Sequence, residues 1–164
     1  MQVSEEIRRA KLQDLGGIGR LAREASQVEG QPDENEVTEW LLSKGVWVAV
    51  RDDALVGVAA WRAENLLAVT DVLLVAPAGH WDEAGSQLLE TIEGEAQTLM
   101  CEANIVLLPS SAPEAARALL QRQGYEPKAR EELHRIWREV LSEYAEELEV
   151  IVKRLRDRMV MVPL

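Results

Sequence analysis

Apolar and polar residues alternate most clearly in the middle of the chain, and this pattern predicts strands. Two apolar runs, Val46–Val50 and Leu55–Trp61, flank the polar segment Arg51–Ala54. Strand-like runs on either side of a tight polar turn are typical of a β-hairpin. A third run, Leu66–Val75, is rich in β-branched residues and stops before Pro77. The three runs together predict an antiparallel meander.

On the N-terminal side of this meander, apolar residues follow helical spacing. A short strand at Ile7–Ala10 is followed by Asp14, which can cap one helix. Asp33 can cap a second, with Glu36 three residues later. The apolar faces of these two helices are formed by Leu15, Ile18, Leu21 and Ala22, and by Val37, Trp40 and Leu41. We therefore predict two helices between the first strand and the hairpin.

Helices and strands alternate again after the meander. The pattern predicts a loop over Pro77–Gly85, a buried strand at Ile105–Leu108, a helix from Ser111 to Gly124 and a short strand from Tyr125. A further helix between the loop and the buried strand presents an apolar face formed by Leu88, Leu89, Ile92, Ala96 and Leu99. These elements fit one continuous sheet covered by helices.

The C-terminal part is predicted to add one helix, one strand and an apolar tail. The helix extends over Ala129–Tyr144 and the strand over Glu147–Arg154. Burial is expected for Leu133, Ile136, Trp137 and Val140. Because unpaired apolar strands tend to pair, the tail Met159–Leu164 is expected to dock on the sheet or on a second copy, which favours a homodimer.

The composition is that of a single folded domain spanning residues 1–164, with 47% hydrophobic and 29% charged residues. The formal net charge of −11 opposes binding to phosphate backbones and anionic lipids. We therefore expect neither nucleic acid nor membrane as a partner, and an amine-bearing partner is favoured instead. A single cysteine, Cys101, permits no internal disulfide, and the N-terminus lacks the apolar run of a signal peptide. Both features indicate a cytoplasmic protein.

No metal site is expected, because no Cys–His pair or compact carboxylate group stands at the spacing that metal ligands need. The imidazoles are His80 and His134. His134 falls on the polar side of the predicted C-terminal helix, where a surface role is expected. Neither lies near Cys101 in the sequence, so a catalytic cysteine is not expected either.

The order of the predicted elements, together with several short segments, resembles the GNAT family of N-acetyltransferases. The segments are IRRAKLQDLGGIGRLAREA at the start, VWVAVRDDALVGVAAW in the hairpin, DVLLVAP at the end of the third meander strand, and QRQGYEP after the Ser111–Gly124 helix. The resemblance covers roughly residues 6–128 and the final strand. It implies a three-layer α/β fold of the α+β type, with a twisted, mixed, mostly antiparallel sheet of about seven strands flanked by helices. The helix at 129–144 is then an insertion before the last strand.

The resemblance implies that acetyl-CoA binds in two places. Backbone groups near the end of the third meander strand, at Leu74 and Val75, would pair with the pantetheine arm. A loop at a helix N-terminus would hold the pyrophosphate, and the residues that match it are His80, Gly85 and Ser86.

This loop departs from the family pattern in its charge. His80 stands where the family has Gln or Arg, and Glu83 stands where it has its first Gly. Asp82 and Glu83 therefore place two carboxylates where the phosphates should lie. Two alternatives follow: a working pyrophosphate site, or a helix whose N-terminus is capped by its own carboxylates.

The resemblance also implies two catalytic positions that this sequence does not fill. The family's general-acid Tyr and its Asn correspond to Leu120 and Pro113. Tyr125, which follows nearby, is expected to occupy an aromatic core position. The acid is therefore absent or comes from elsewhere in the chain.

A candidate base remains. Asp71 lies in the third meander strand, where the family often has an acidic residue, and strand alternation predicts that it shares one face with Leu73 and Val75. It is the candidate general base or amine anchor, and a solvated strand carboxylate is the alternative. Acceptor specificity is expected from the loop Gln27–Pro32 and from residues 129–147.

Two functions remain open from the sequence. One is an N-acetyltransferase that moves an acetyl group from acetyl-CoA to a small amine or a peptide amine. The other is a catalytically inactive GNAT-fold protein that acts as a binding or dimerisation module.

Overall fold

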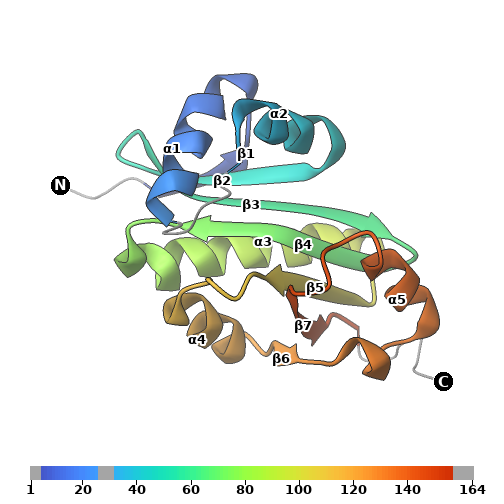
Figure 1. The fold of residues 1–164 in the computed structure, drawn as a ribbon. Helices are drawn as coiled ribbons and strands as arrows, with labels where there is room; N and C mark the ends of the chain where they lie inside the picture. Colours follow the sequence, from blue (N-terminus) through green and yellow to red (C-terminus); the bar gives the residue numbers. More distant parts are fainter. Residues whose placement is uncertain (1–4, 26–31, 157–164) are drawn as a thin grey trace.

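The computed structural model describes residues 5–25 and 32–156, which form one seven-stranded sheet in the order β1-β2-β3-β4-β5-β7-β6 (Figure 1). The strands are β1 (Glu5–Arg9), β2 (Gly45–Arg51), β3 (Ala54–Glu64), β4 (Leu67–Val75), β5 (Ala103–Leu108), β6 (Glu126–Pro127) and β7 (Glu149–Arg154). Neighbouring strands are antiparallel except β4 and β5, which are parallel. The predicted meander is confirmed as β2, β3 and β4, and the hairpin turn uses positive φ angles at Asp52 and Asp53.

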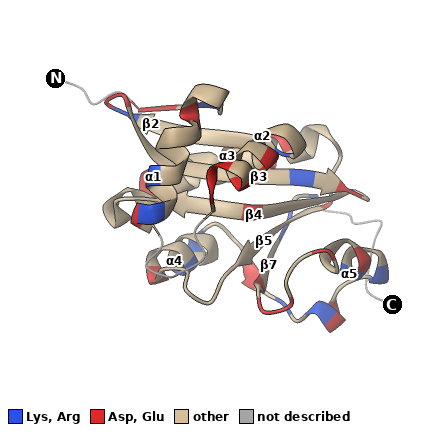
Figure 2. Cartoon of the chain, turned by 45° about the horizontal axis from the view of Figure 1, so that its top comes forward, with Lys and Arg blue, Asp and Glu red and all other residues tan. Residues whose placement is uncertain are grey.

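Helices cover both faces of the sheet. They are α1 (Leu15–Ala25), α2 (Glu34–Ser43), α3 (Ser86–Thr98), α4 (Glu114–Arg122) and α5 (Arg135–Leu141). One core cluster joins α1 and α2 to the sheet, a second joins α3 and α4 to its other face, and a third packs α5 against β5 and β7. Lys, Arg, Asp and Glu lie mainly on the helices and the strand ends, and most of the central sheet is free of them (Figure 2). The predicted three-layer arrangement is confirmed.

The parallel pair β4–β5 separates soon after it begins. The ladder joins Leu67–Thr70 to Ala103–Val106 and stops there, although β4 continues to Val75 and β5 to Leu108. The two strands are thus splayed into a V.

The prediction for residues 129–144 was partly wrong. A 3-10 turn, Arg130–Glu132, precedes the shorter helix α5, because the backbone is extended at Leu133 and His134. The Nδ1 atom of His134 accepts a hydrogen bond of 3.1 Å from the backbone N–H of Ile136 and so caps α5. Leu133, Trp137 and Val140 are buried as expected, but Ile136 is only half-buried.

Residues 77–85 do not form the predicted loop. The chain becomes helical at Ala78. A 3-10 turn over Ala78–His80 is followed by one turn of π-helix over Trp81–Gly85, which leads into α3. Most of the predicted Gln27–Pro32 loop and the tail Met159–Leu164 lie outside the described residues. The docking of the tail and the homodimer therefore stay predictions. None of the helices in the described ranges is both long and apolar enough to cross a bilayer.

Candidate active site

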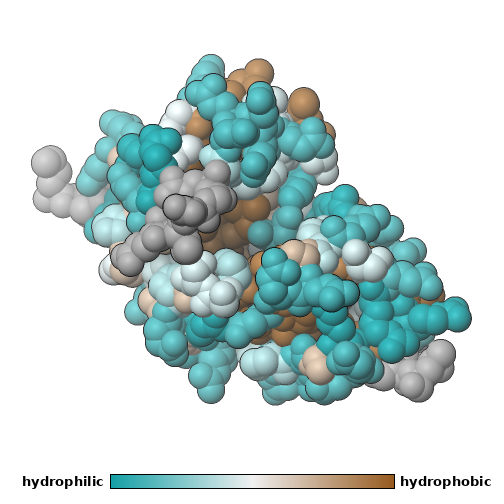
Figure 3. Space-filling model, viewed as in Figure 1, coloured by the Kyte–Doolittle hydropathy of each residue, from teal (hydrophilic) through white to brown (hydrophobic). Residues whose placement is uncertain are grey.

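The splayed ends of β4 and β5 enclose a cavity of about 290 Å³, here called the β4–β5 cleft. Its walls are largely apolar and include Val72, Leu73, Leu107 and Leu108, while Trp40 and Trp81 line it from outside the sheet. In the space-filling view, apolar residues are visible in a hollow between the part that carries α1 and α2 and the part that carries α4 (Figure 3). Within the described residues, the β5-facing edge of β4 has no ladder partner beyond Thr70.

Asp71 lies where the two strands begin to separate, and it is the extra residue of a β-bulge. Ala60 pairs with Val72 and Trp61 pairs with Thr70, so Asp71 is left without a partner on β3. A bulge reverses the alternation of side chains along a strand and is common beside active sites.

Because of the bulge, the Asp71 side chain lies on the opposite face of the sheet from Leu73 and Val75, and the prediction that the three share one face is wrong. Leu73 and Val75 pack in the cluster below α3 and α4. The Asp71 carboxylate instead contacts Lys44, the residue that ends α2 on the opposite face. Simple alternation fails here because one residue is inserted between Thr70 and Val72.

The Asp71–Lys44 pair is largely withdrawn from solvent. The Lys44 side chain is 13% exposed and that of Asp71 is 15% exposed. Lys44 Nζ contacts Asp71 Oδ2, while Asp71 Oδ1 is buried and has no hydrogen-bond partner among residues 5–25 and 32–156. A buried acceptor without a partner costs about 1–3 kcal/mol. Asp71 Oδ1 therefore remains available to a donor that enters the cleft.

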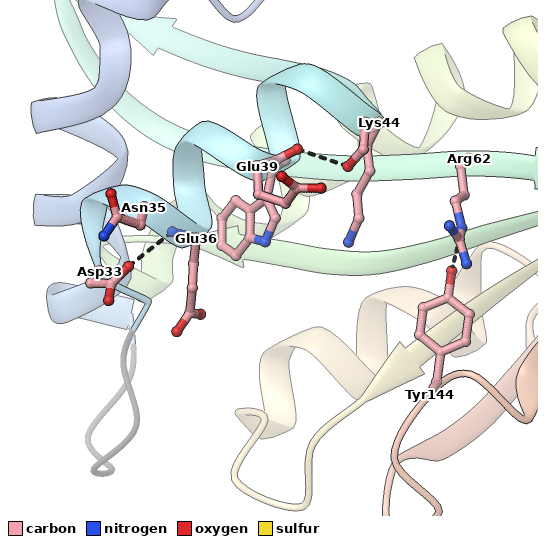
Figure 4. Close-up of a pocket in the computed structure, with 9 residues that line it drawn as sticks. Asp33, Asn35, Glu36, Glu39, Lys44, Arg62 and Tyr144 are labelled. Atoms are coloured by element: carbon pink, nitrogen blue, oxygen red, sulfur yellow. Dashed lines mark hydrogen bonds between the residues drawn. The ribbon is translucent and has the colours of Figure 1, made fainter.

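A second cavity, of about 490 Å³, adjoins the cleft and is here called the α2 pocket (Figure 4). It is lined by Asp33, Asn35, Glu36, Glu39, Trp40, Ser43, Lys44, Arg62 and Tyr144. Glu36 and Trp40 line both cavities, which makes them neighbours. Asp33 caps α2 by accepting a 2.9 Å bond from the Glu36 N–H, as predicted.

The α2 pocket has an excess of negative charge. Its two cationic side chains are both paired, Lys44 with Asp71 and Arg62 with Glu143. The carboxylates of Asp33, Glu36 and Glu39 are exposed along α2. Three acidic groups thus face the pocket without an equal number of unpaired cations, and the pocket attracts positively charged molecules.

Tyr144 lies beside Arg62 in the lining of this pocket (Figure 4), and the sequence did not single it out as a site residue. The Nε atom of Arg62 donates a 2.9 Å hydrogen bond to the phenol oxygen of Tyr144. Burial raises the pKa of Tyr144, and the charge of Asp71 raises that pKa further, while the bond from Arg62 acts in the opposite direction. Tyr144 therefore holds its proton at neutral pH. In the sequence Tyr144 is only the last residue of the predicted helix Ala129–Tyr144, and no local motif marks it as a polar functional group.

The segment predicted to hold pyrophosphate is built differently from the expected loop. Asp82 pairs with Arg122 of α4, and Glu83 lies 3.5 Å from Arg51 of β2. Neither carboxylate caps a helix, because the chain is already helical from Ala78. The self-capping hypothesis is therefore wrong.

The predicted residues of this segment have other contacts. His80 Nδ1 lies 3.3 Å from Arg51 Nη1, and Ser86 Oγ accepts a 3.3 Å bond from Gln123. Gly85 is buried, and a Cβ atom there would lie 2.5 Å from Leu119 Cδ2. A larger residue at position 85 would force Leu119 or Trp81 to shift, so the packing of α4 against this turn favours glycine with or without a ligand. Leu74 and Val75 lie on β4 beyond the end of its ladder to β5, and Leu74 lines the cleft.

Other potential reactive groups are held in the core. Leu120 is buried at the position of the family's Tyr. Tyr125 donates a 2.9 Å bond to Glu93 and accepts one of 2.8 Å from Asn104, and burial raises its pKa far above that of a free phenol. Burial also raises the pKa of the Cys101 thiol. Among the described residues, no cluster of His, Cys, Asp or Glu forms a candidate metal site.

The chain is similar in structure to solved acetyltransferases. An acetyltransferase of the GNAT family from Staphylococcus aureus Mu50 superposes with a TM-score of 0.76 at 14% identity, over 93% of this chain and 100% of that one. The chain has the GNAT fold. N-acetylglutamate synthase from Neisseria gonorrhoeae, complexed with coenzyme A and N-acetylglutamate, gives a TM-score of 0.73 at 18% identity. The match covers 95% of this chain but 36% of the synthase, so the chain spans about a third of that protein.

A third structure, the PaiA N-acetyltransferase from Thermoplasma acidophilum in complex with coenzyme A, gives a TM-score of 0.70 at 13% identity. That match covers 92% of this chain and 99% of the other. By sequence, no family model and no curated protein matches. The similarity to known proteins is therefore detected in the structure and not in the sequence.

Proposed function

We propose that this chain is an N-acetyltransferase that moves an acetyl group from acetyl-CoA to a small amine or a peptide amine. The open edge of β4 in the β4–β5 cleft carries this proposal. An extended molecule with amide groups can pair with an open strand edge as an added strand does. The pantetheine arm is such a molecule, and Leu74 and Val75 would offer it their backbone groups. Similar structures that hold coenzyme A or acetyl-CoA support this reading.

The phosphate end of acetyl-CoA would lie along Ala78–Ser86. Neighbouring arginine side chains, more than the backbone N–H groups of this segment, would hold it. The backbone N–H groups of His80, Trp81 and Ser86 already donate within the segment. Arg51 and Arg122 flank it instead, each paired with an exposed carboxylate. Exposed pairs contribute about 1 kcal/mol or less, so both guanidinium groups can exchange a carboxylate for a phosphate, which arginine binds well.

The acceptor amine would enter through the α2 pocket. Its acidic wall on α2 favours a positively charged amine, and Asp71 of the cleft pairs with Lys44, which lines the pocket. Asp71 Oδ1, which has no partner within the described part of the chain, would accept a hydrogen bond from the amine and orient it toward the acetyl carbonyl. Asp71 is therefore the candidate base or anchor, and Tyr144, still protonated, is the candidate proton donor on the opposite wall.

The alternative is a GNAT-fold protein without catalysis. It is favoured by the buried Leu120 at the family's Tyr position and by the carboxylates that occupy Arg51 and Arg122. Calorimetric titration with acetyl-CoA, followed by an assay of thiol release with monoamines, diamines and basic peptides, separates the two. Binding with release supports the enzyme, and binding without release supports the binding module. Absence of binding contradicts acetyl-CoA as co-substrate.

A further inference from the structure

The site already contains a primary amine, that of Lys44. Lys44 ends α2, and its backbone N–H donates a 2.9 Å bond to the carbonyl of Trp40. From this fixed point its side chain extends away from α2 toward the sheet (Figure 4). Its Nζ atom contacts Asp71 Oδ2. The ammonium group thus lies against the carboxylate assigned to the acceptor amine.

The location of Asp71 brings this amine close to the acetyl group. Asp71 is the first residue of β4 beyond the ladder to β5, at the narrow end of the cleft. A pantetheine arm that pairs with the open edge of β4 from Val75 toward Asp71 would end with its thioester beside Asp71. The nucleophile closest to that carboxylate is Lys44 Nζ.

We infer that the chain acetylates its own Lys44, an inference that rests on the proposed acetyl-CoA site. The ammonium group gives one proton to the Asp71 carboxylate along their hydrogen bond. The free amine attacks the thioester carbonyl, a C–N bond forms, and the C–S bond breaks. Nitrogen loses its second proton, the CoA thiolate takes up one, and one proton is released to solvent. The products are an acetyl-lysine amide and free coenzyme A.

The other lysines of the chain provide an internal control. They are Lys11, Lys128 and Lys153. The Lys128 side chain is 39% exposed and that of Lys153 is 27% exposed, against 13% for Lys44. Uncatalysed acetylation follows access to solvent, so it modifies Lys44 least. Acetylation within the β4–β5 cleft would instead modify Lys44 fastest of the four lysines.

The test is incubation of the full chain with acetyl-CoA, followed by peptide mass mapping of all four lysines over time. In the folded chain, we expect Lys44 to be modified at least about tenfold faster than Lys128, in line with general-base assistance. In the chain unfolded by urea, we expect Lys44 to be modified no faster than Lys128. Lys44→Arg should abolish the modification. Asp71→Asn should slow it about tenfold or more, provided its circular dichroism matches the parent.

The outcomes separate this inference from the proposed function. If acetyl-CoA binds and an added amine is acetylated while Lys44 stays unmodified, the self-acetylation is overturned and the enzyme stands. A Lys44 rate that is the same in folded and unfolded chains also overturns it, whatever the variants do. If calorimetry detects no binding of acetyl-CoA, both proposals fail.

Discussion

Lys44 and Asp71 join the C-terminal end of α2 to the bulge in β4 through an ion pair in which the side chains are 13% and 15% exposed. Removing one partner of a buried pair leaves an uncompensated charge, at a cost of about 3–5 kcal/mol. Lys44→Met should therefore lower the free energy of unfolding by about 3 kcal/mol or more, measured in urea. Lys128→Met is the matched control, since Lys128 pairs with Glu126 at 3.7 Å on the surface and should cost less than about 1 kcal/mol. Equal losses in the two variants would contradict the buried pair.

Tyr144 should matter for turnover more than for folding. Tyr144→Phe removes the phenol oxygen that accepts from Arg62 but keeps the aromatic ring. If Tyr144 donates a proton during transfer, kcat should fall about 10²-fold or more, with coenzyme A affinity retained. Because its pKa is raised above that of a free phenol, about 10, the parent should show no loss of rate from this group below that pH. A variant with parental kcat would remove Tyr144 from the chemistry.

A substitution at Gly85 tests whether this residue is needed for packing or for binding a ligand. A Cβ at Gly85 would meet Leu119 Cδ2 at 2.5 Å and Trp81 Cε3 at 3.0 Å, whereas a Cβ at Gly94 in α3 meets nothing within 4 Å. Gly85→Ala should therefore destabilise the chain by about 1–3 kcal/mol without any ligand. Gly94→Ala should stabilise it by about 0.5–1 kcal/mol, because alanine favours a helix interior. Thermal unfolding of both apo variants gives the comparison, and a harmless Gly85→Ala would refute the packing requirement.

The fold could be predicted from the sequence because its signals are local. The β2–β3 hairpin follows from alternation and a polar turn, and the cap of α2 follows from Asp33. Asp14, which was expected to cap the first helix, instead accepts from the Lys11 N–H and pairs with Arg8 in the turn before α1. The site depends on non-local facts. Asp71 changes face because of a bulge measured against β3, and Tyr144 meets Arg62 although the two lie 82 positions apart. The carboxylates at Asp82 and Glu83 suggested caps because no sequence pattern showed where Arg51 and Arg122 would lie.

Asp14 should contribute to stability in a pH-dependent way. Arg8 donates two hydrogen bonds, of 2.8 and 3.0 Å, to its carboxylate, and these bonds are the main reason why the pKa of Asp14 is lowered. A lowered folded-state pKa means that the stabilisation is complete above the unfolded-state value, about 3.9, and is lost as pH falls through the folded-state value.

The corresponding experiment is urea unfolding of the parent chain and of Asp14→Asn at several pH values. The variant should lose about 1.5–3 kcal/mol at pH 7, the contribution of hydrogen bonds to a charged group. The gap should narrow from about pH 4 downward, because the carboxylate of the unfolded parent takes up its proton first and that of the folded parent only at lower pH. A difference that stays constant down to the acid limit would mean that the charge of Asp14 is not what stabilises it.

The last prediction concerns the phosphate end of acetyl-CoA. If Arg51 and Arg122 hold the phosphates, then Asp82 and Glu83 compete with the ligand for them. Asp82→Asn and Glu83→Gln each remove one competing charge and one repulsive contact. Both carboxylates are exposed, Asp82 to 82% and Glu83 to 57%, so the gain lies near the water end of the Coulomb range, about 1 kcal/mol.

Each carboxylate variant should therefore tighten the Kd for acetyl-CoA about threefold to tenfold in calorimetric titration. Arg122→Ala should weaken binding, and its effect should shrink as salt is raised, because exposed charges are screened. Glu126→Gln on β6 is the matched control, since Glu126 is also exposed and paired but pairs with Lys128 instead. Its Kd should equal that of the parent. If all four variants bind acetyl-CoA as the parent does, the phosphates lie elsewhere, and the assignment of Arg51 and Arg122 is wrong while the pantetheine cleft is unaffected.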